Sequence, residues 1–182
     1  MSKAVIFFAP GQEECEGLLC VDLLRRAGVE VQVCAVNDEL TVTCSHGTRL
    51  VCDALAADAD PAADAVILPG GIPGTPNLAA SETVCDTVRA FYASGRLVAA
   101  ICAAPTVLGG LGLLQGRRAT CYPGCEGDLG GAECVDADAV RDGNLITGRA
   151  LGAAIPFALE IIAYLEGAER AEKAKNAIVY RH

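Results

Sequence analysis

The sequence predicts an α/β protein in which a mostly parallel sheet carries helices on both faces. Short continuous apolar runs such as 4–9 and 97–102 are typical of strands that are buried on both sides. Stretches of 10–15 residues with helical spacing alternate with these runs, as in βαβ units. The 182 residues show no internal repeat and no linker, so we expect one domain over residues 1–182.

The first third of the chain predicts two strands, a helix and a hairpin. The apolar run 4–9 precedes a helical pattern over 13–27, and a glycine follows that pattern as a helix stop. The run 29–36 is the second strand. Two short runs, 41–44 and 48–52, flank Ser-His-Gly and predict a β-hairpin.

The middle of the chain repeats the strand–helix alternation. A buried strand over 64–71 runs into glycines, and Ser81 is well placed to cap a helix that ends near residue 94. The run 97–102 is the next strand. A helix over 104–114 is expected directly after it.

The last third predicts two short strands and two helices. The strands are expected at 118–122 and 144–148. A helix over 153–166 ends at Gly167, and a polar helix over 168–178 follows it.

Composition restricts the partners. A chain of this length can bury about 70% of its unfolded surface, so its core needs neither disulfide nor metal. The formal net charge of -9, without a Lys/Arg cluster, repels phosphate backbones and anionic lipid, and we expect neither nucleic acid nor membrane as a partner. The apolar part of the N-terminus is too short for a signal peptide, and no segment approaches the roughly 20 apolar residues of a membrane span. A soluble, cytoplasmic protein is expected.

The ten cysteines do not form a recognisable framework. Cys34, Cys44, Cys85 and Cys102 lie within or beside apolar stretches, and no CxxC occurs, so we expect reduced thiols that mostly act as small hydrophobic residues. The nearest approach to a zinc pattern is Cys121-x3-Cys125 with Cys134, but zinc ligand pairs usually have tighter spacing. No metal and no cofactor are predicted.

Cys102 is the cysteine whose position favours chemistry. It stands where a buried strand ends and a helix begins, at the edge of the sheet where α/β proteins place their sites. The free N–H groups of a helix start favour the thiolate, which is the reactive form, and should lower the thiol pKa. A buried structural cysteine is the alternative, and this position alone leaves both open.

Glu16 is a candidate partner. On a helix it shares the apolar stripe with Cys20 and Leu23, whereas Glu13 and Glu14 lie partly off that stripe. A carboxyl in an apolar setting has a raised pKa and can carry a proton. Alternatively, the three acids simply favour the N-terminal end of the helix.

The segment LPGGIPGTPNL at 68–78 contains glycines at 70, 71 and 74. It matches neither GxGxxG nor GxxxxGK[ST], so nucleotide binding is disfavoured. Glycines also let backbone N–H groups approach a substrate oxygen closely, and this use fits the segment better.

Three features together resemble the ThiJ/PfpI superfamily: a Glu on the first helix, the loop LPGG-x-x-G-x-x-N-L, and AICA-x-P-T at a strand end. More narrowly, they resemble its small branch, that of the parkinsonism-associated deglycase and bacterial YajL. The resemblance covers nearly the whole chain, including VDLLRRAGVEV and FALEIIAYLEG. It implies a flavodoxin-like three-layer α/β/α sandwich with a β-hairpin extension, usually assembled as a homodimer.

The resemblance also implies roles for single residues. Cys102 matches the nucleophile and Glu16 the acid that shares a proton with it. Gly71 and Ala103 match the N–H donors for an oxyanion, and Gly70 stands beside them. The implied enzyme needs no cofactor and acts on a small carbonyl substrate, a 2-oxoaldehyde such as methylglyoxal or its adducts. In the alternative function, redox sensing or chaperone-like protection, the same cysteine is oxidised to a sulfinate without turnover.

The sequence departs from the family pattern at two positions. Tyr122 stands where relatives carry a histidine; a phenol is a poor base at neutral pH but can donate a hydrogen bond. Of the two histidines, His182 is the last residue, whereas His46 in the hairpin turn is a candidate to reach the site of a partner subunit. Ala103 follows the nucleophile where the hydrolase branch has a histidine, so a cysteine hydrolase is the least favoured alternative.

Overall fold

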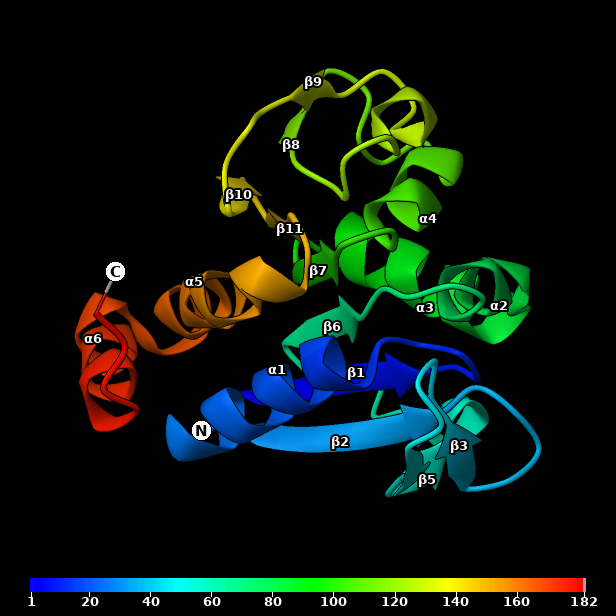
Figure 1. Ribbon diagram of the computed structural model, residues 1–182, viewed down its shortest axis with the longest axis horizontal. Helices are drawn as coiled ribbons and strands as arrows, with labels where there is room; N and C mark the ends of the chain where they lie inside the picture. Colours follow the sequence, from blue (N-terminus) through cyan, green and yellow to red (C-terminus); the bar gives the residue numbers. More distant parts are fainter. Residues whose placement is uncertain (182) are drawn as a thin grey trace.

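The computed structural model describes residues 1–181, and its centre is a seven-stranded sheet (Figure 1). All neighbouring strands in this sheet are parallel except the first pair, β10 and β11. The strands in sheet order are β10 (Ala139–Asp142), β11 (Leu145–Gly148), β7 (Leu97–Ile101), β6 (Ala65–Leu68), β1 (Lys3–Phe8), β2 (Glu30–Ala35) and β5 (Ala54–Leu55).

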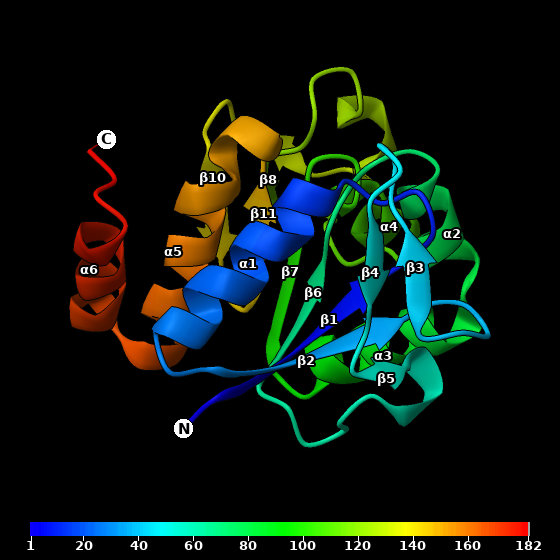
Figure 2. The ribbon, with the colours of Figure 1, turned by 60° about the horizontal axis from the view of Figure 1, so that its bottom comes forward.

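Helices cover both faces of the sheet, which makes a three-layer α/β/α sandwich. One layer contains α1 (Glu14–Arg26), α5 (Ala154–Glu166) and α6 (Ala168–Ala177). The other contains α2 (Gly74–Ala80), α3 (Glu82–Ala93) and α4 (Pro105–Gly110). Figure 2 shows α1 and α5 side by side in front of the strands, with α6 outside α5. The sandwich and the mostly parallel sheet confirm the predicted fold class.

Strand β1 shows why the core has two halves. Ala4, Ile6 and Phe8 pack into the core under α1 and α5, whereas Val5 and Phe7 face α3 and α4. Successive side chains of a strand point to opposite faces, so a strand covered on both faces must be apolar at every position. The continuous apolar run of the sequence follows from this geometry.

Two small sheets and three 3-10 turns lie outside the main sheet. β3 (Thr41–Thr43) and β4 (Arg49–Val51) form the predicted hairpin. β8 (Arg118–Ala119) pairs in parallel with β9 (Glu133–Cys134). The turns are η1 (Ala56–Asp58), η2 (Glu126–Asp128) and η3 (Leu151–Ala153). None of the helices formed by the described residues is long and apolar enough to cross a membrane.

The glycine-rich stretch after β6 differs from the prediction. It contains helix α2, where the sequence predicts an irregular loop. Gly74 begins this helix against the backbone of Gln12, and a Cβ at Gly74 would lie only 2.5 Å from the Gln12 nitrogen. This glycine is therefore required by a close approach of two chain segments, which sequence spacing does not reveal.

The region after β7 also differs. Helix α4 is shorter than the predicted 104–114, because it ends at a run of glycines of which Gly112 has a φ of 75°. The predicted strand 118–122 shrinks to β8 and pairs outside the main sheet. β10 was not predicted, since a polar, half-exposed edge strand lacks a continuous apolar run.

Candidate functional site

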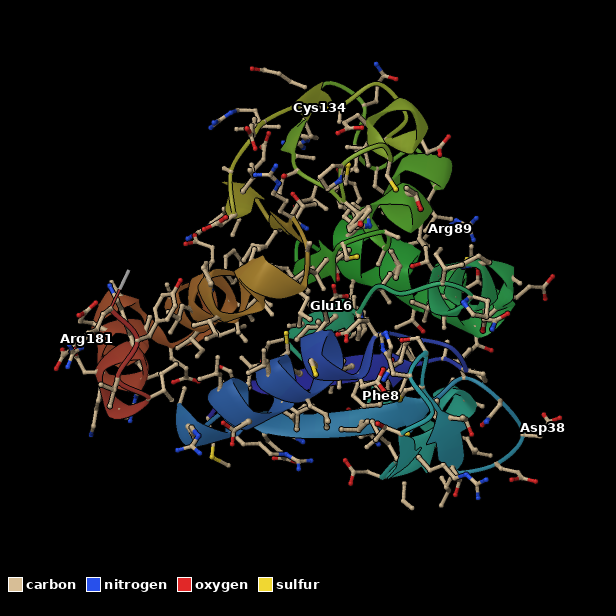
Figure 3. The ribbon with its side chains drawn as sticks, viewed as in Figure 1. Phe8, Glu16, Asp38, Arg89, Cys134 and Arg181 are labelled. Carbon is tan, nitrogen blue, oxygen red and sulfur yellow. The ribbon has the colours of Figure 1, made fainter. Side chains whose placement is uncertain are left out.

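Cys102, Glu16 and the two glycines of the predicted site meet at the carboxyl ends of β6 and β7. Cys102 follows β7 directly, Gly70 and Gly71 follow β6, and Glu16 lies in the first turn of α1. Figure 3 shows Glu16 between α1 and the segment that follows β6. Open parallel sheets bind ligands at this edge.

Cys102 occupies a strained turn. Its φ of 65° is one of only two positive φ values among the non-glycine residues that the structure describes. Two backbone hydrogen bonds hold it: its N–H donates to the Gly148 carbonyl at 2.9 Å, and its carbonyl accepts from the Tyr122 N–H at 2.8 Å. Such strain persists only where the surrounding structure enforces it, and it is frequent at functional sites. The residue is 9% exposed.

Glu16 is buried beside this turn, with only 1% of its surface exposed. Its Oε2 accepts a hydrogen bond from the Gly70 N–H at 2.9 Å, and the carboxyl is hydrogen-bonded to the Cys102 thiol. Gly70 leaves the room for this contact, because a Cβ there would lie 2.5 Å from the Cys102 Cβ and 2.8 Å from Glu16 Oε2. The glycine is needed for the pair to meet.

Burial governs the electrostatics of the pair. It raises the pKa of Glu16 to about 7, against the lowering effect of hydrogen bonds from the Cys102 thiol and the Gly70 N–H. Burial, together with the neighbouring Glu16 carboxylate, raises the pKa of the Cys102 thiol to about 12. Two groups that interact this strongly lose their protons as a pair. Over most of the pH range between these values, the pair therefore holds one proton.

The prediction that the helix start lowers the Cys102 pKa is wrong while Glu16 carries the negative charge. Helix α4 has six residues, so its dipole is small, whereas burial and the carboxylate both disfavour a second charge. The backbone N–H groups of Gly71 and Ala103 do act in the predicted direction, since both hydrogen-bond the sulfur. Because the pair holds one proton, Cys102 is a thiolate in the state in which Glu16 carries that proton.

Gly71 is fixed by its surroundings as well. It has a φ of 93°, in the left-handed region that favours glycine, and a Cβ there would collide with the backbone of Glu13. The segments before α1 and after β6 are thus in contact, and the Glu13 N–H donates to the Gly70 carbonyl at 2.9 Å. This contact positions Gly71, whose backbone N–H hydrogen-bonds the Cys102 sulfur.

Glu13 has a role that the sequence reasoning missed. Its carboxylate accepts the backbone N–H of Glu16 at 2.7 Å and so caps α1. The cap fixes the helix turn that carries Glu16. The spacing of three residues between two glutamates at a helix start is the signal that could have revealed it.

The other predicted residues lie farther from the sulfur or point away. Tyr122 binds the Cys102 carbonyl through its backbone, but its side chain is 50% exposed and its hydroxyl has no partner among the described residues. His46 stands in the hairpin turn, with Nδ1 3.1 Å from Glu14 Oε2. His182 lies outside the described residues.

A cavity of about 440 Å³ adjoins this site. Ala103, Thr106 and Val107 line one side, and Ile72 and Thr75 of the segment after β6 line another. Thr75 is 4% exposed, and its hydroxyl has no hydrogen-bond partner within the described part of the chain. The sequence reasoning missed Thr75 because it did not predict α2.

Comparisons with known proteins agree with this architecture. A family model described as the DJ-1/PfpI family matches residues 2–164. The chain is 40% identical over 183 residues to protein dj-1beta of Drosophila melanogaster, with 98% of both covered. It is 34% identical over 172 residues to the glutathione-independent glyoxalase DJR-1.2 of Caenorhabditis elegans, with 92% of this chain and 91% of the relative covered.

Solved structures support the same assignment. The crystal structure of Drosophila melanogaster DJ-1beta matches this fold with a TM-score of 0.95 and 38% sequence identity, over 100% of both chains. The flavodoxin-like α/β fold implied by the sequence resemblance is thus confirmed. With matches of this extent in both sequence and structure, the chain belongs to the DJ-1/PfpI family.

Proposed function

We propose that this protein is a cofactor-independent enzyme that converts 2-oxoaldehydes, such as methylglyoxal, or their adducts into 2-hydroxy acids. Cys102 is the nucleophile and Glu16 moves the protons. A relative named as a glutathione-independent glyoxalase supports a reaction of this class. The observation that carries the proposal is the buried Glu16 carboxyl that lies beside Cys102 at the strained turn after β7.

The first step forms a bond between Cys102 Sγ and the aldehyde carbon. Glu16 takes the thiol proton as the sulfur attacks, because the carboxyl and the thiol are already hydrogen-bonded. The aldehyde oxygen gains negative charge, and the N–H groups of Gly71 and Ala103 are placed to stabilise it, since both reach the sulfur. Glu16 then returns the proton to this oxygen, and a hemithioacetal results.

The second step moves hydrogen between neighbouring carbons. The Glu16 carboxylate removes the proton from the former aldehyde carbon and delivers it to the former ketone carbon, while the hydroxyl proton passes to the ketone oxygen. The first carbon is oxidised by two electrons and the second is reduced by two, so no external oxidant or cofactor is required. Water then cleaves the thioester, which releases the hydroxy acid and restores the thiol. The net reaction of methylglyoxal and water gives lactate.

Lactate formation by the purified protein tests this proposal. We expect lactate from methylglyoxal with the wild type, and a loss of at least about 100-fold in kcat/KM for Cys102→Ser and Glu16→Gln, the range for removing a nucleophile or a general acid–base group. Cys134→Ser is the matched control, because Cys134 is an exposed thiol away from the pair. Absence of lactate with the wild type, or full activity of Cys102→Ser, would contradict the proposal.

Oxidation of Cys102 without turnover is the second candidate function. Glu16 favours it, because a protonated carboxyl beside the sulfur can donate a hydrogen bond to a sulfinate. Each peroxide molecule transfers one oxygen atom to the sulfur and leaves as water, so two molecules give the sulfinate.

Peptide mass spectrometry after treatment with limited peroxide distinguishes specific oxidation of Cys102 from unspecific oxidation of solvent-exposed thiols. Cys15 and Cys134 are exposed, whereas Cys102 is buried. A specific redox role predicts sulfinate at Cys102 before either exposed thiol is oxidised. Oxidation of Cys15 and Cys134 ahead of Cys102 would exclude it.

A further inference from the structure

One group of metal-ligating side chains lies beside the Cys102–Glu16 pair and is not used by the proposed chemistry. Glu13 and Glu14 stand at the start of α1, and His46 stands in the turn of the β3–β4 hairpin. Their donor atoms all lie within 4.8 Å of one another. In the part of the chain that the structure describes, no other three His, Cys, Asp or Glu side chains converge in this way.

Backbone hydrogen bonds hold the hairpin against the start of α1. The Gly11 N–H donates to the Thr43 carbonyl at 2.9 Å, and the Ser45 N–H donates to the Gln12 carbonyl at 2.8 Å. Gly47 completes the turn with a φ of 86°. His46 is therefore placed opposite the two glutamates by the fold itself, before any ligand arrives.

Glu14 has an oxygen without a partner. The residue is 6% exposed, and its Oε2 accepts hydrogen bonds from the Ser45 hydroxyl at 3.1 Å and the His46 backbone N–H at 3.3 Å. Its Oε1 is buried and has no hydrogen-bond partner among the described residues. A buried carboxylate with an unpartnered oxygen is costly, and a cation bound beside this carboxylate would lower that cost.

Glu13 and His46 complete the group. Oε2 of Glu13 is held by the Glu16 N–H, whereas Oε1 lies 4.0 Å from His46 Nδ1. His46 Nδ1 also lies 3.1 Å from Glu14 Oε2. The His46 side chain is 73% exposed, so an ion can enter from solvent.

We propose that Glu13, Glu14 and His46 form a binding site for a divalent transition-metal ion of the Zn²⁺ type. Ligand atoms around one Zn²⁺ lie about 3–4 Å apart, given Zn–N and Zn–O bonds of about 2.0–2.2 Å, and the separations of 3.1 and 4.0 Å fall in this range. Two carboxylate charges outweigh the roughly half positive charge of the α1 start, so a cation is attracted. The imidazole nitrogen selects against Mg²⁺ and Ca²⁺, which prefer oxygen ligands.

Zn²⁺ titration followed by NMR of the imidazoles tests this site directly, because the chain has only two histidines. We expect one equivalent of Zn²⁺ to shift the His46 ring signals, and an excess of Mg²⁺ or Ca²⁺ to leave them unchanged. In calorimetry, His46→Gln and Glu13→Gln should each weaken Zn²⁺ binding by about tenfold or more, because even the loss of an outer-shell partner costs that much.

Two matched variants separate this site from other ligands in the chain. His182→Gln removes the second histidine, and Cys15→Ser removes an exposed thiol in the same helix turn; both should bind Zn²⁺ as the wild type does. Melting of the metal-free His46→Gln variant at the wild-type temperature shows that its fold is intact. Three results would each overturn the proposal: His46 ring signals that do not shift when Zn²⁺ is added, Zn²⁺ binding by His46→Gln that is as tight as that of the wild type, or loss of Zn²⁺ binding in Cys15→Ser.

Discussion

At the scale of single residues, the central feature is a carboxyl that the fold buries against a thiol. Glu16 is 1% exposed, and its Oε1 has no hydrogen-bond partner among the described residues. A group in this position destabilises the protein once it is ionised, and the same property lets it accept and return a proton near neutral pH. Stability and the proposed function are therefore opposed at this residue.

The Glu16→Gln substitution should show the stability cost of the ionised Glu16 carboxyl in the pH dependence of unfolding. The pKa of Glu16 rises from 4.5 to about 7 on folding, so the wild type loses about 3 kcal/mol of stability between pH 4.5 and 7 and regains none above that range. The variant has no carboxyl to ionise, so its free energy of unfolding relative to the wild type should increase over the same interval. Urea unfolding under reducing conditions measures this difference in the free energy of unfolding between the variant and the wild type. A difference that does not change with pH would show that Glu16 is not held in this environment.

At the scale of elements, the turn from β7 to α4 carries the strain. Cys102 adopts a φ of 65° because its N–H and its carbonyl are both bound, to Gly148 and to Tyr122. A residue with a Cβ loses roughly 1–2 kcal/mol in this conformation, whereas glycine does not. The turn keeps a cysteine where glycine would be the more stable choice.

Two substitutions at Cys102 measure that strain. Ala is normally more favourable than Gly in ordered structure, but at this φ we expect Cys102→Gly to exceed Cys102→Ala in unfolding free energy by about 1 kcal/mol. Both variants lack the thiol, so the comparison isolates the backbone. If Cys102→Ala is the more stable of the two, the turn is not strained.

The individual elements also show how much of the fold can be predicted from the sequence alone. Continuous apolar runs predicted β1, β6 and β7, because strands covered on both faces must be apolar at every position. They could not predict α2 or β10, whose positions depend on contact with Gln12 and on an exposed edge. At the site, the ordered motifs predicted that Cys102 and Glu16 lie together, and the structure places the Glu16 carboxyl beside Cys102. The predicted direction of the Cys102 pKa shift was wrong, because this shift depends first on the burial of the thiol and then on the charge of Glu16, which is distant in the chain.

At the scale of the whole molecule, the family resemblance predicts a homodimer. Large apolar side chains remain exposed on a single copy, among them Leu18 on α1 and Val51 on β4, the latter 77% exposed. Single exposed apolar residues are common on protein surfaces, so the family resemblance, and not this exposure, carries the prediction of a dimer. The hairpin that carries Val51 also carries His46, so assembly would bring a second copy close to the proposed metal site.

Light scattering after gel filtration tests the assembly. We expect a mass of twice the 18.7 kDa chain for the wild type and a shift toward the single-chain mass for Val51→Glu, because a buried carboxylate without a partner is costly. Val179→Glu is the control, since Val179 is similarly exposed, at 68%, but lies near the C-terminus. A single-chain mass for the wild type, or equal effects of the two substitutions, would contradict a dimer through the hairpin.

The most direct measurement is the alkylation rate of Cys102 as a function of pH, followed on its own peptide in the wild type and in Glu16→Gln. If the two side chains share one proton, the wild-type rate should rise around pH 7 as the first proton leaves the pair. In Glu16→Gln this rise should be absent, and a single ionisation of the thiol should replace it. The same pH profile in both proteins would contradict the shared proton, and with it the proposed chemistry.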